Sequence, residues 1–195
     1  MSRISGVCGI IAPIVAFSCI LLAVSFYPPF SWTDNALSDL GVQAEPTSIL
    51  FNYGLIASGV MALVFGIGLY DLLGSTVSGK VGVFLFILAS LTLIAIGVFN
   101  ENYAPIHWYV SVIFFTSFSL SMFVLAAALL KLGRLRVGLF TFLVAMSAAT
   151  PWIAYFTARY VEGVAVPETI SALAASMWAM VLGYKMLKKP SHSPM

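Results

Sequence analysis

The sequence predicts an all-α, polytopic integral membrane protein with six transmembrane helices, and three observations carry this prediction. Hydrophobic residues make up 61% of the 195 residues and charged residues only 8%, whereas soluble domains carry about a quarter charged residues. Several apolar segments are long enough to cross a bilayer. The charged residues between these segments also alternate in sign from one connection to the next, which is typical of a chain that crosses a membrane repeatedly.

Six segments have the length that crosses a bilayer core, about 20 mostly apolar residues each. They cover residues 6–27, 48–70, 81–99, 107–130, 137–157 and 168–187. The connections are short except for the first, which runs from about Pro28 to Thr47. We therefore expect one six-helix domain over residues 1–195 and no separate soluble domain.

The first segment has two interpretations. It follows Arg3 and resembles a signal peptide, with Ala23-Val24-Ser25 as a weak cleavage site. Its length is sufficient for a full span, so we expect a retained first helix. Its two cysteines, Cys8 and Cys19, would lie about 16 Å apart along such a helix, too far for a disulfide within the chain. We expect them to be packing residues.

Basic residues predict the orientation, because lysine and arginine concentrate in the cytoplasmic connections of membrane proteins. Eight of the nine fall at the N-terminus, in the second and fourth connections and in the C-terminal tail. These are Arg3, Lys80, Lys131, Arg134, Arg136, Lys185, Lys188 and Lys189. Only Arg159 falls in the opposite set. We expect a multi-pass protein of the cell membrane with both termini cytoplasmic, whose positive charge indicates topology and not nucleic-acid binding.

Small residues and prolines indicate how the helices pack. Small residues recur every four positions in the second and sixth segments: Gly54, Ser58, Ala62 and Gly66, then Ala175, Ala179 and Gly183. Such stripes let transmembrane helices approach closely, so we expect contacts within the chain more than a dimer interface. Pro13 and Pro151 each remove one helical hydrogen bond and are expected to bend their helices.

Polar side chains gather at the end opposite the basic residues, where five of the six helices contribute one. The candidate ligand or pocket residues are Ser38, Asp39, Asn52, Asn100, Glu101, His107, Ser111, Tyr155 and Arg159. Glu162 and Glu168 lie before or at the start of the sixth segment in the same layer. Ionisable groups near a membrane are costly to bury unless they are paired or used. We therefore expect an outward-facing polar pocket, with Asp39 and His107 close enough to share a water.

Part of this layer resembles a known family. The stretch Asn35-Ala36-Leu37-Ser38-Asp39-Leu40-Gly41, then Phe51-Asn52 and His107, is similar to the uncharacterised six-helix membrane family catalogued as domain of unknown function 998. The resemblance covers nearly the whole chain and assigns no role to its motif positions. A Ser-Asp-x-Gly-like loop with a Phe and a His on later helices is more distantly similar to the Frag/DRAM/Sfk group, some of which are implicated in lipid remodelling. The resemblance implies a role in handling lipid by analogy only.

Each candidate also has a structural interpretation. Ser38 and Asp39 are of the types that cap a short helix or turn. His107 would fit the interfacial aromatic belt beside Trp108 and Tyr109. Arg159 would pair with one of the neighbouring acids or grip a lipid phosphate.

Metal binding is the sharpest enzymatic alternative, because Asp34, Asp39, Glu101 and His107 offer the ligands that zinc or a harder divalent ion accepts. No two of them have a recognised ligand spacing, and we expect no cofactor. A nucleophilic pair of Ser111 and His107, one helical turn apart, is a weaker alternative.

The favoured hypothesis is a pocket that binds or handles a membrane lipid or another amphiphile. One alternative is a membrane-embedded, metal-dependent hydrolase or transferase acting on lipid head groups. The second is a channel or transporter, although no basic residue or carboxylate lies near the middle of a span. The sequence leaves all three open.

Overall fold

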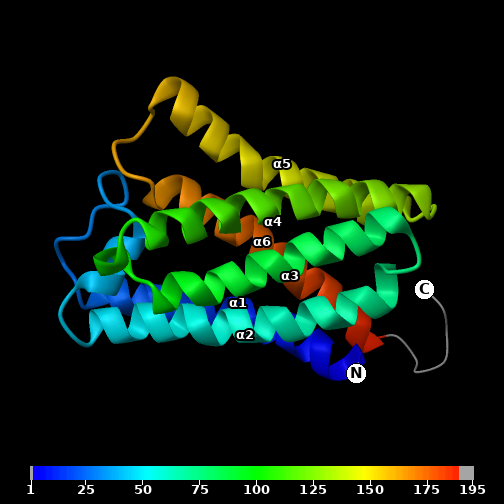
Figure 1. Cartoon of the computed structure of the whole chain (residues 1–195), viewed down its shortest axis with the longest axis horizontal. Coiled ribbons are helices and arrows are strands. Elements are labelled where there is room, and N and C mark those ends of the chain that lie inside the picture. The colour runs from blue at the N-terminus through cyan, green and yellow to red at the C-terminus, as the bar shows by residue number, and fades with distance from the viewer. Residues whose placement is uncertain (1, 189–195) are drawn as a thin grey trace.

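The computed structural model describes residues 2–188, which contain helices and no strand (Figure 1). Six long helices follow in order: α1 (Ser2–Ser25), α2 (Thr47–Leu73), α3 (Val77–Val98), α4 (Ile106–Lys131), α5 (Leu135–Ala158) and α6 (Ala165–Lys188). Two short 3₁₀ helices, η1 (Leu37–Val42) and η2 (Glu101–Tyr103), lie in the first and third connections. All six long helices are long and apolar enough to cross a membrane. The predicted all-α membrane fold is therefore confirmed.

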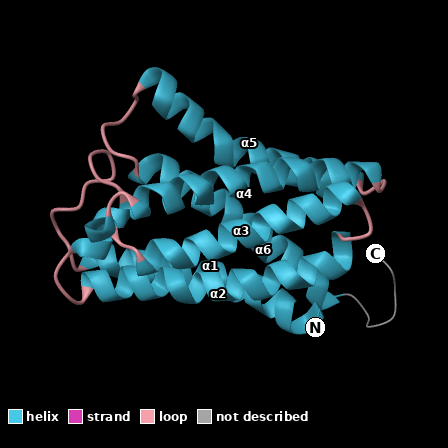
Figure 2. Ribbon diagram, in the orientation of Figure 1, coloured by secondary structure: helices cyan, strands magenta, loops and turns pink. Residues whose placement is uncertain are grey.

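The helices form a closed ring in chain order. Each long helix packs against its neighbours in the chain, and α1 also packs against α6. The first, third and fifth connections lie at one end of the bundle, which we name the lid end, and the second and fourth lie at the other, the basic end (Figure 2). The start of α1 and the end of α6 both lie at the basic end (Figure 1). Lys189 of the basic tail lies outside the described residues.

A solid core fills the half of the bundle nearer the basic end. Trp178 of α6 is fully buried and packs edge-on against Phe65 of α2, with ring centroids 5.9 Å apart. Its ring also meets Phe86 of α3, with centroids 5.6 Å apart. The indole Nε1 donates to the Thr141 hydroxyl of α5 at 3.0 Å, so the one polar atom of this side chain is satisfied. Trp178 thus joins four helices.

Close backbone contacts set the helix spacing at several glycines. A Cβ atom on Gly183 of α6 would lie 2.6 Å from the Gly6 carbonyl oxygen of α1, so only glycine permits this approach. A Cβ on Gly54 of α2 would lie 2.4 Å from Cys19 Cβ of α1. These ends of the small-residue stripes therefore make the expected contacts. The middle members of the stripes, Ser58, Ala62, Ala175 and Ala179, line a cavity instead.

Helix α5 diverges from the rest of the bundle at the lid end, where it leans away from α4 (Figure 1). Trp152, next to Pro151, spans the space between its neighbours: its ring lies 4.7 Å from that of Phe115 in α4. Its Nε1 donates to the Ser171 hydroxyl of α6 at 3.1 Å. One side chain of α5 therefore contacts both flanking helices.

Candidate functional site: a cavity beneath a lid

The first connection folds over the lid end as a short segment, residues 35–43, which we name the lid. Asp39 organises it: its Oδ2 accepts from the Ala36 backbone N–H at 3.0 Å and from Asn35 Nδ2 at 2.6 Å. The Gln43 side chain donates to the Asp39 carbonyl oxygen at 2.8 Å. Of the two interpretations of Asp39, the structure therefore supports capping of η1.

Two asparagines hold the lid to the bundle. Asn52 Nδ2 of α2 and Asn100 Nδ2, which precedes η2, both donate to the Gly41 carbonyl oxygen, at 2.8 and 3.3 Å. A Cβ on Gly41 would lie 2.6 Å from Asn52 Oδ1, so any other residue here would force the Asn52 side chain to move. Beneath this contact the apolar side chain of Leu40 is completely buried.

Two acids hold the same segment from other elements. The Ser38 hydroxyl donates to Glu101 Oε1 at 2.6 Å. The Leu37 backbone N–H donates to Glu168 Oε2, in the first turn of α6, at 2.7 Å. The Ala165 N–H also donates to the Asn35 carbonyl oxygen at 2.8 Å. The lid is therefore bound to α2, to the third connection and to α6.

His107, at the start of α4, is buried and has a defined proton arrangement. Its Nδ1 lies 2.7 Å from the Phe99 carbonyl oxygen. A carbonyl only accepts, so Nδ1 carries a proton and donates. The Nε2 atom lies a long 3.4 Å from the Ser111 hydroxyl oxygen. His107 thus connects α4 to the end of α3. The aromatic-belt interpretation did not include this contact.

Glu101 lies close enough to Asp39 and His107 for both to influence its carboxyl group. Loss of solvent on burial raises the pKa of its carboxyl above the ordinary value, and the nearby negative charge of Asp39 raises it further. The Ser38 hydrogen bond and the proximity of His107 act in the opposite direction. Asp39 and His107 therefore both influence Glu101, whereas their own approach through a shared water stays a prediction.

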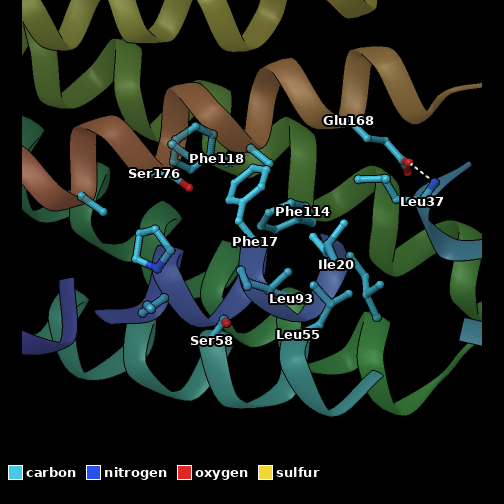
Figure 3. Close-up of a pocket in the computed structure, with 18 of the residues that line it drawn as sticks. Phe17, Ile20, Leu37, Leu55, Ser58, Leu93, Phe114, Phe118, Glu168 and Ser176 are labelled. Atoms are coloured by element: carbon cyan, nitrogen blue, oxygen red, sulfur yellow. Dashed lines mark hydrogen bonds between the residues drawn. The ribbon is translucent and has the colours of Figure 1, made fainter. Parts of the chain in front are cut away.

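A narrow cavity lies directly beneath the lid. Its volume is about 140 Å³, and side chains from every long helix except α5 line it. The wall is almost entirely apolar, with Phe17, Ile20, Leu55, Leu93 and Phe114 around its upper part (Figure 3). Leu37 and Ser38 form the roof.

The cavity has one charged wall residue, Glu168, which is only 8% exposed. Figure 3 shows its carboxylate at the roof, bonded to Leu37. No described residue among 2–188 donates to its other oxygen, Oε1. The sequence placed Glu168 in the right layer but not among the candidates. The feature of the sequence that could have identified Glu168 is a single carboxylate at the start of an otherwise apolar membrane-spanning segment.

The predicted site residues divide into four groups. Ser38 and Ser111 line the cavity, whereas Asp39, Asn52 and Asn100 hold the lid in place and Glu101 and His107 stand behind it. Tyr155 and Arg159 belong to a separate contact: Arg159 Nη1 donates to the Tyr155 hydroxyl at 3.2 Å, and its guanidinium lies 5.1 Å from that ring's centroid. Neither residue lines the cavity.

The proposed metal ligands are not assembled into one group. Asp34 lies in an exposed turn, where hydrogen bonds from Ser31 and Thr33 lower its pKa. Over residues 2–188, no three His, Cys, Asp or Glu side chains stand together in a way that could hold a metal ion.

The six apolar spans define a multi-pass integral membrane protein. The chain belongs to the family described as "Protein of unknown function (DUF998)", whose model matches residues 10–185. This confirms the resemblance found in the sequence. Comparison with curated proteins and with solved structures gave no match.

Proposed function

We propose that the protein binds one chain of an amphiphile, such as a membrane lipid, in the cavity beneath the lid. The observation that carries the proposal is the wall itself: an apolar interior with a few polar groups at one end is the usual form of such a site. The apolar part suits a hydrocarbon chain. The polar part, formed by Ser38, Ser111 and Glu168, suits the group that joins the chain to its head.

The dimensions favour a single chain. The lining residues of α6 run from Glu168 to Ala179, about 16 Å along the helix axis. An engineered apolar protein cavity of roughly 150 Å³ is known to hold one benzene molecule. A volume of about 140 Å³ therefore accommodates a segment of one chain and not a complete two-chain lipid. Any remaining part of the ligand would lie outside the cavity.

The other two functions have less support. A channel needs a continuous path, whereas Phe65, Phe86 and Phe118 line the deep part of the cavity and Phe65 and Phe86 pack on Trp178 below it. A metal-dependent hydrolase needs a set of ligands, and residues 2–188 bring no such set together. The distant similarity to the Frag/DRAM/Sfk group stays an expectation consistent with lipid binding.

We place the lid on the non-cytoplasmic side of the membrane. The support is the charge distribution: Lys80, Lys131, Arg134 and Arg136 lie in or beside the connections at the basic end, and such residues favour the cytoplasm. A cysteine introduced at exposed Trp32 should react with an impermeant thiol reagent added outside intact cells. A cysteine at exposed Lys188 should not react.

Filling the cavity tests the binding proposal. Ala172 of α6 lines the cavity one turn below Glu168, and the next residue, Leu173, is 51% exposed on the outer surface. Ala172→Phe places a ring in the cavity, whereas Leu173→Phe adds a ring on the same helix without entering it. Both proteins would be purified in the same mild detergent, and the retained lipids would be measured by mass spectrometry.

We expect wild type and Leu173→Phe to retain the same amphiphile at near-stoichiometric level, and Ala172→Phe to lose most of it. Equal retention by all three proteins would contradict the proposal. Circular dichroism and thermal unfolding of Ala172→Phe would establish that it is folded, and Ala62→Phe on α2 provides a second filled cavity if it is not.

A further inference from the structure

We propose that the group bound beneath the lid is a positively charged hydrogen-bond donor, a protonated amine, and not an anionic head group. This inference rests on the proposed function, because it assigns the head-group chemistry of the same cavity. It follows from a comparison of the polar atoms around the roof that already form hydrogen bonds within the protein with those that do not.

The donors at the roof are already engaged with protein atoms. The Leu37 N–H donates to Glu168, and the Ser38 hydroxyl donates to Glu101. The Ala36 N–H and the Asn35 amide both donate to Asp39. An anionic group entering the cavity would therefore find these N–H and O–H groups occupied.

One acceptor is left over in the same place. Glu168 lines the cavity with one carboxyl oxygen bonded to Leu37, and no donor to its other oxygen occurs within residues 2–188. A ligand N–H group would supply the donor that this oxygen lacks.

The charge of the layer favours the same ligand. Asp39, Glu101 and Glu168 lie close enough to influence one another electrostatically. No lysine or arginine in the described part of the chain forms a salt bridge with any of these three carboxylates, and Arg159 donates to Tyr155. His107 acts on Glu101 in the sense of a cation but does not line the cavity, so no basic side chain faces Glu168 across it. A cation at the roof would therefore be attracted by this cluster, and an anion would be repelled.

An independent observation deeper in the wall indicates that the cavity is built for a ligand. Ser58 of α2 lines the cavity, is only 2% exposed, and its hydroxyl has no hydrogen-bond partner. Other helical serines of this chain satisfy their hydroxyls locally: Ser90 donates to the Phe86 carbonyl at 2.9 Å and Ser117 to the Ile113 carbonyl at 2.6 Å. Ser176 on α6 also lines the cavity, and Figure 3 shows both hydroxyls. The apolar wall thus contains a hydroxyl group, that of Ser58, that forms no hydrogen bond with the protein.

The test uses three probes with one tail and different heads: octylamine, octanol and octanoate. Purified protein in lipid nanodiscs would be titrated with each probe at neutral pH, and affinity would be taken from the ligand-dependent rise in unfolding temperature. The Ala172→Phe variant measures the part of the signal that comes from the bilayer alone. Only the signal lost in this variant counts as binding in the cavity.

We expect octylamine to bind at least about tenfold more tightly than octanol, because a charge-assisted hydrogen bond replaces a neutral one. Octanoate should bind more weakly than octanol. Glu168→Gln should reduce the preference for the amine over the alcohol to about twofold or less. Glu162→Gln, an exposed acid in the α5–α6 connection, is the matched control and should leave the preference unchanged.

The outcomes separate the two proposals. Octanoate or octanol binding as tightly as octylamine, with all three signals lost in Ala172→Phe, would overturn the amine assignment and leave the binding function intact. Absence of any signal that Ala172→Phe removes would overturn the binding function itself. The comparison of probes on the wild-type protein needs no variant of Glu168, so it can refute the amine assignment even if Glu168→Gln folds poorly.

Discussion

Leu37 and Glu168 are 131 residues apart in sequence, yet the backbone N–H of Leu37 donates to the carboxylate of Glu168 at 2.7 Å. This bond fastens the first connection to the last helix. Both residues also line the cavity, so the contact that holds the lid is part of the wall that a ligand would touch. Occupancy of the cavity and stability of the lid should therefore depend on each other.

Ser38→Ala should loosen the lid without unfolding the bundle. The change removes the 2.6 Å hydrogen bond from Ser38 to Glu101. A hydrogen bond contributes about 0.5–1.5 kcal/mol, so amide exchange in residues 35–43 should accelerate by up to about tenfold. Hydrogen–deuterium exchange with mass spectrometry measures this. Ser31→Ala, in the same connection but outside the lid, should leave the exchange of residues 35–43 unchanged.

The stability contributed by Glu101 should fall as the pH rises. Burial raises the pKa of this carboxyl above its ordinary value of 4.5, so the folded state favours the protonated form. Below pH 4.5 the group is protonated in both states and its contribution is complete. As the pH rises, the unfolded chain ionises first, and the contribution is lost until the pH passes the raised folded pKa.

The measurement is the difference in unfolding free energy between wild type and Glu101→Gln across this pH range. A difference that stays constant, or that grows with pH, would contradict the sign. Asp34→Asn provides the opposite case, because hydrogen bonds from Ser31 and Thr33 lower the pKa of this exposed carboxyl below 3.8. Its contribution should be present above pH 3.8 and lost as the pH falls through the lowered folded pKa.

Gly163→Ala should disturb the lid end more than Gly41→Ala. A Cβ at Gly163 would lie 2.3 Å from the Asn35 carbonyl oxygen, a backbone atom that cannot move alone. The Gly163 N–H also donates to the Thr33 carbonyl at 2.7 Å, so the two connections would separate. A Cβ at Gly41 would meet the Asn52 side chain, which can rotate at a smaller cost.

We expect the unfolding temperature to fall clearly for Gly163→Ala and by less for Gly41→Ala, as measured by differential scanning fluorimetry. The reverse order would show that the amide of Asn52 is held more firmly than the backbone of the first connection.

Ser58→Ala and Ser121→Ala should change stability in opposite directions. The Ser58 hydroxyl is buried without a partner, so its removal relieves an unsatisfied group and should raise stability by up to about 1 kcal/mol. The Ser121 hydroxyl donates across the helix interface to the Gly82 carbonyl at 2.7 Å, so its removal should cost about 1 kcal/mol. Thermal unfolding of the delipidated proteins measures both. A loss of stability in Ser58→Ala would mean that its hydroxyl has a partner in the free protein.

The fold was predictable because hydropathy and charge act along the chain. Six runs of apolar residues require six helices in a bilayer, since only a helix satisfies the backbone within one segment. Ser38 and Ser111 could be assigned to the polar layer for the same reason, because Ser38 lies in the first connection and Ser111 near the lid end of its segment.

A pocket at this end was expected, but the residues that line the cavity could not be predicted, because they depend on how stripes of small residues meet. Ser58 and Ala62 belong to a four-residue repeat that reads as a packing seam. In the bundle the ends of that seam touch α1 and α3 through Gly54 and Gly66, and the middle faces empty space. Glu168 could not be singled out from the sequence, because the helix dipole favours an acid in the first turn of any helix. Its hydrogen bond to Leu37 depends on three-dimensional proximity alone.

The seam where Gly6 meets Gly183 has a consequence for biosynthesis. Every other long-helix interface in the ring joins consecutive segments, so those pairs can dock as each hairpin leaves the translocation machinery. The contact between α1 and α6 joins the first segment to the last, so the ring closes only when the last segment arrives. Until then the interior of the bundle is open toward the surrounding acyl chains. Formation of the contact between α1 and α6 would enclose any acyl chain that lies there. The proposed binding of an acyl chain would then begin during synthesis, before the ring has closed.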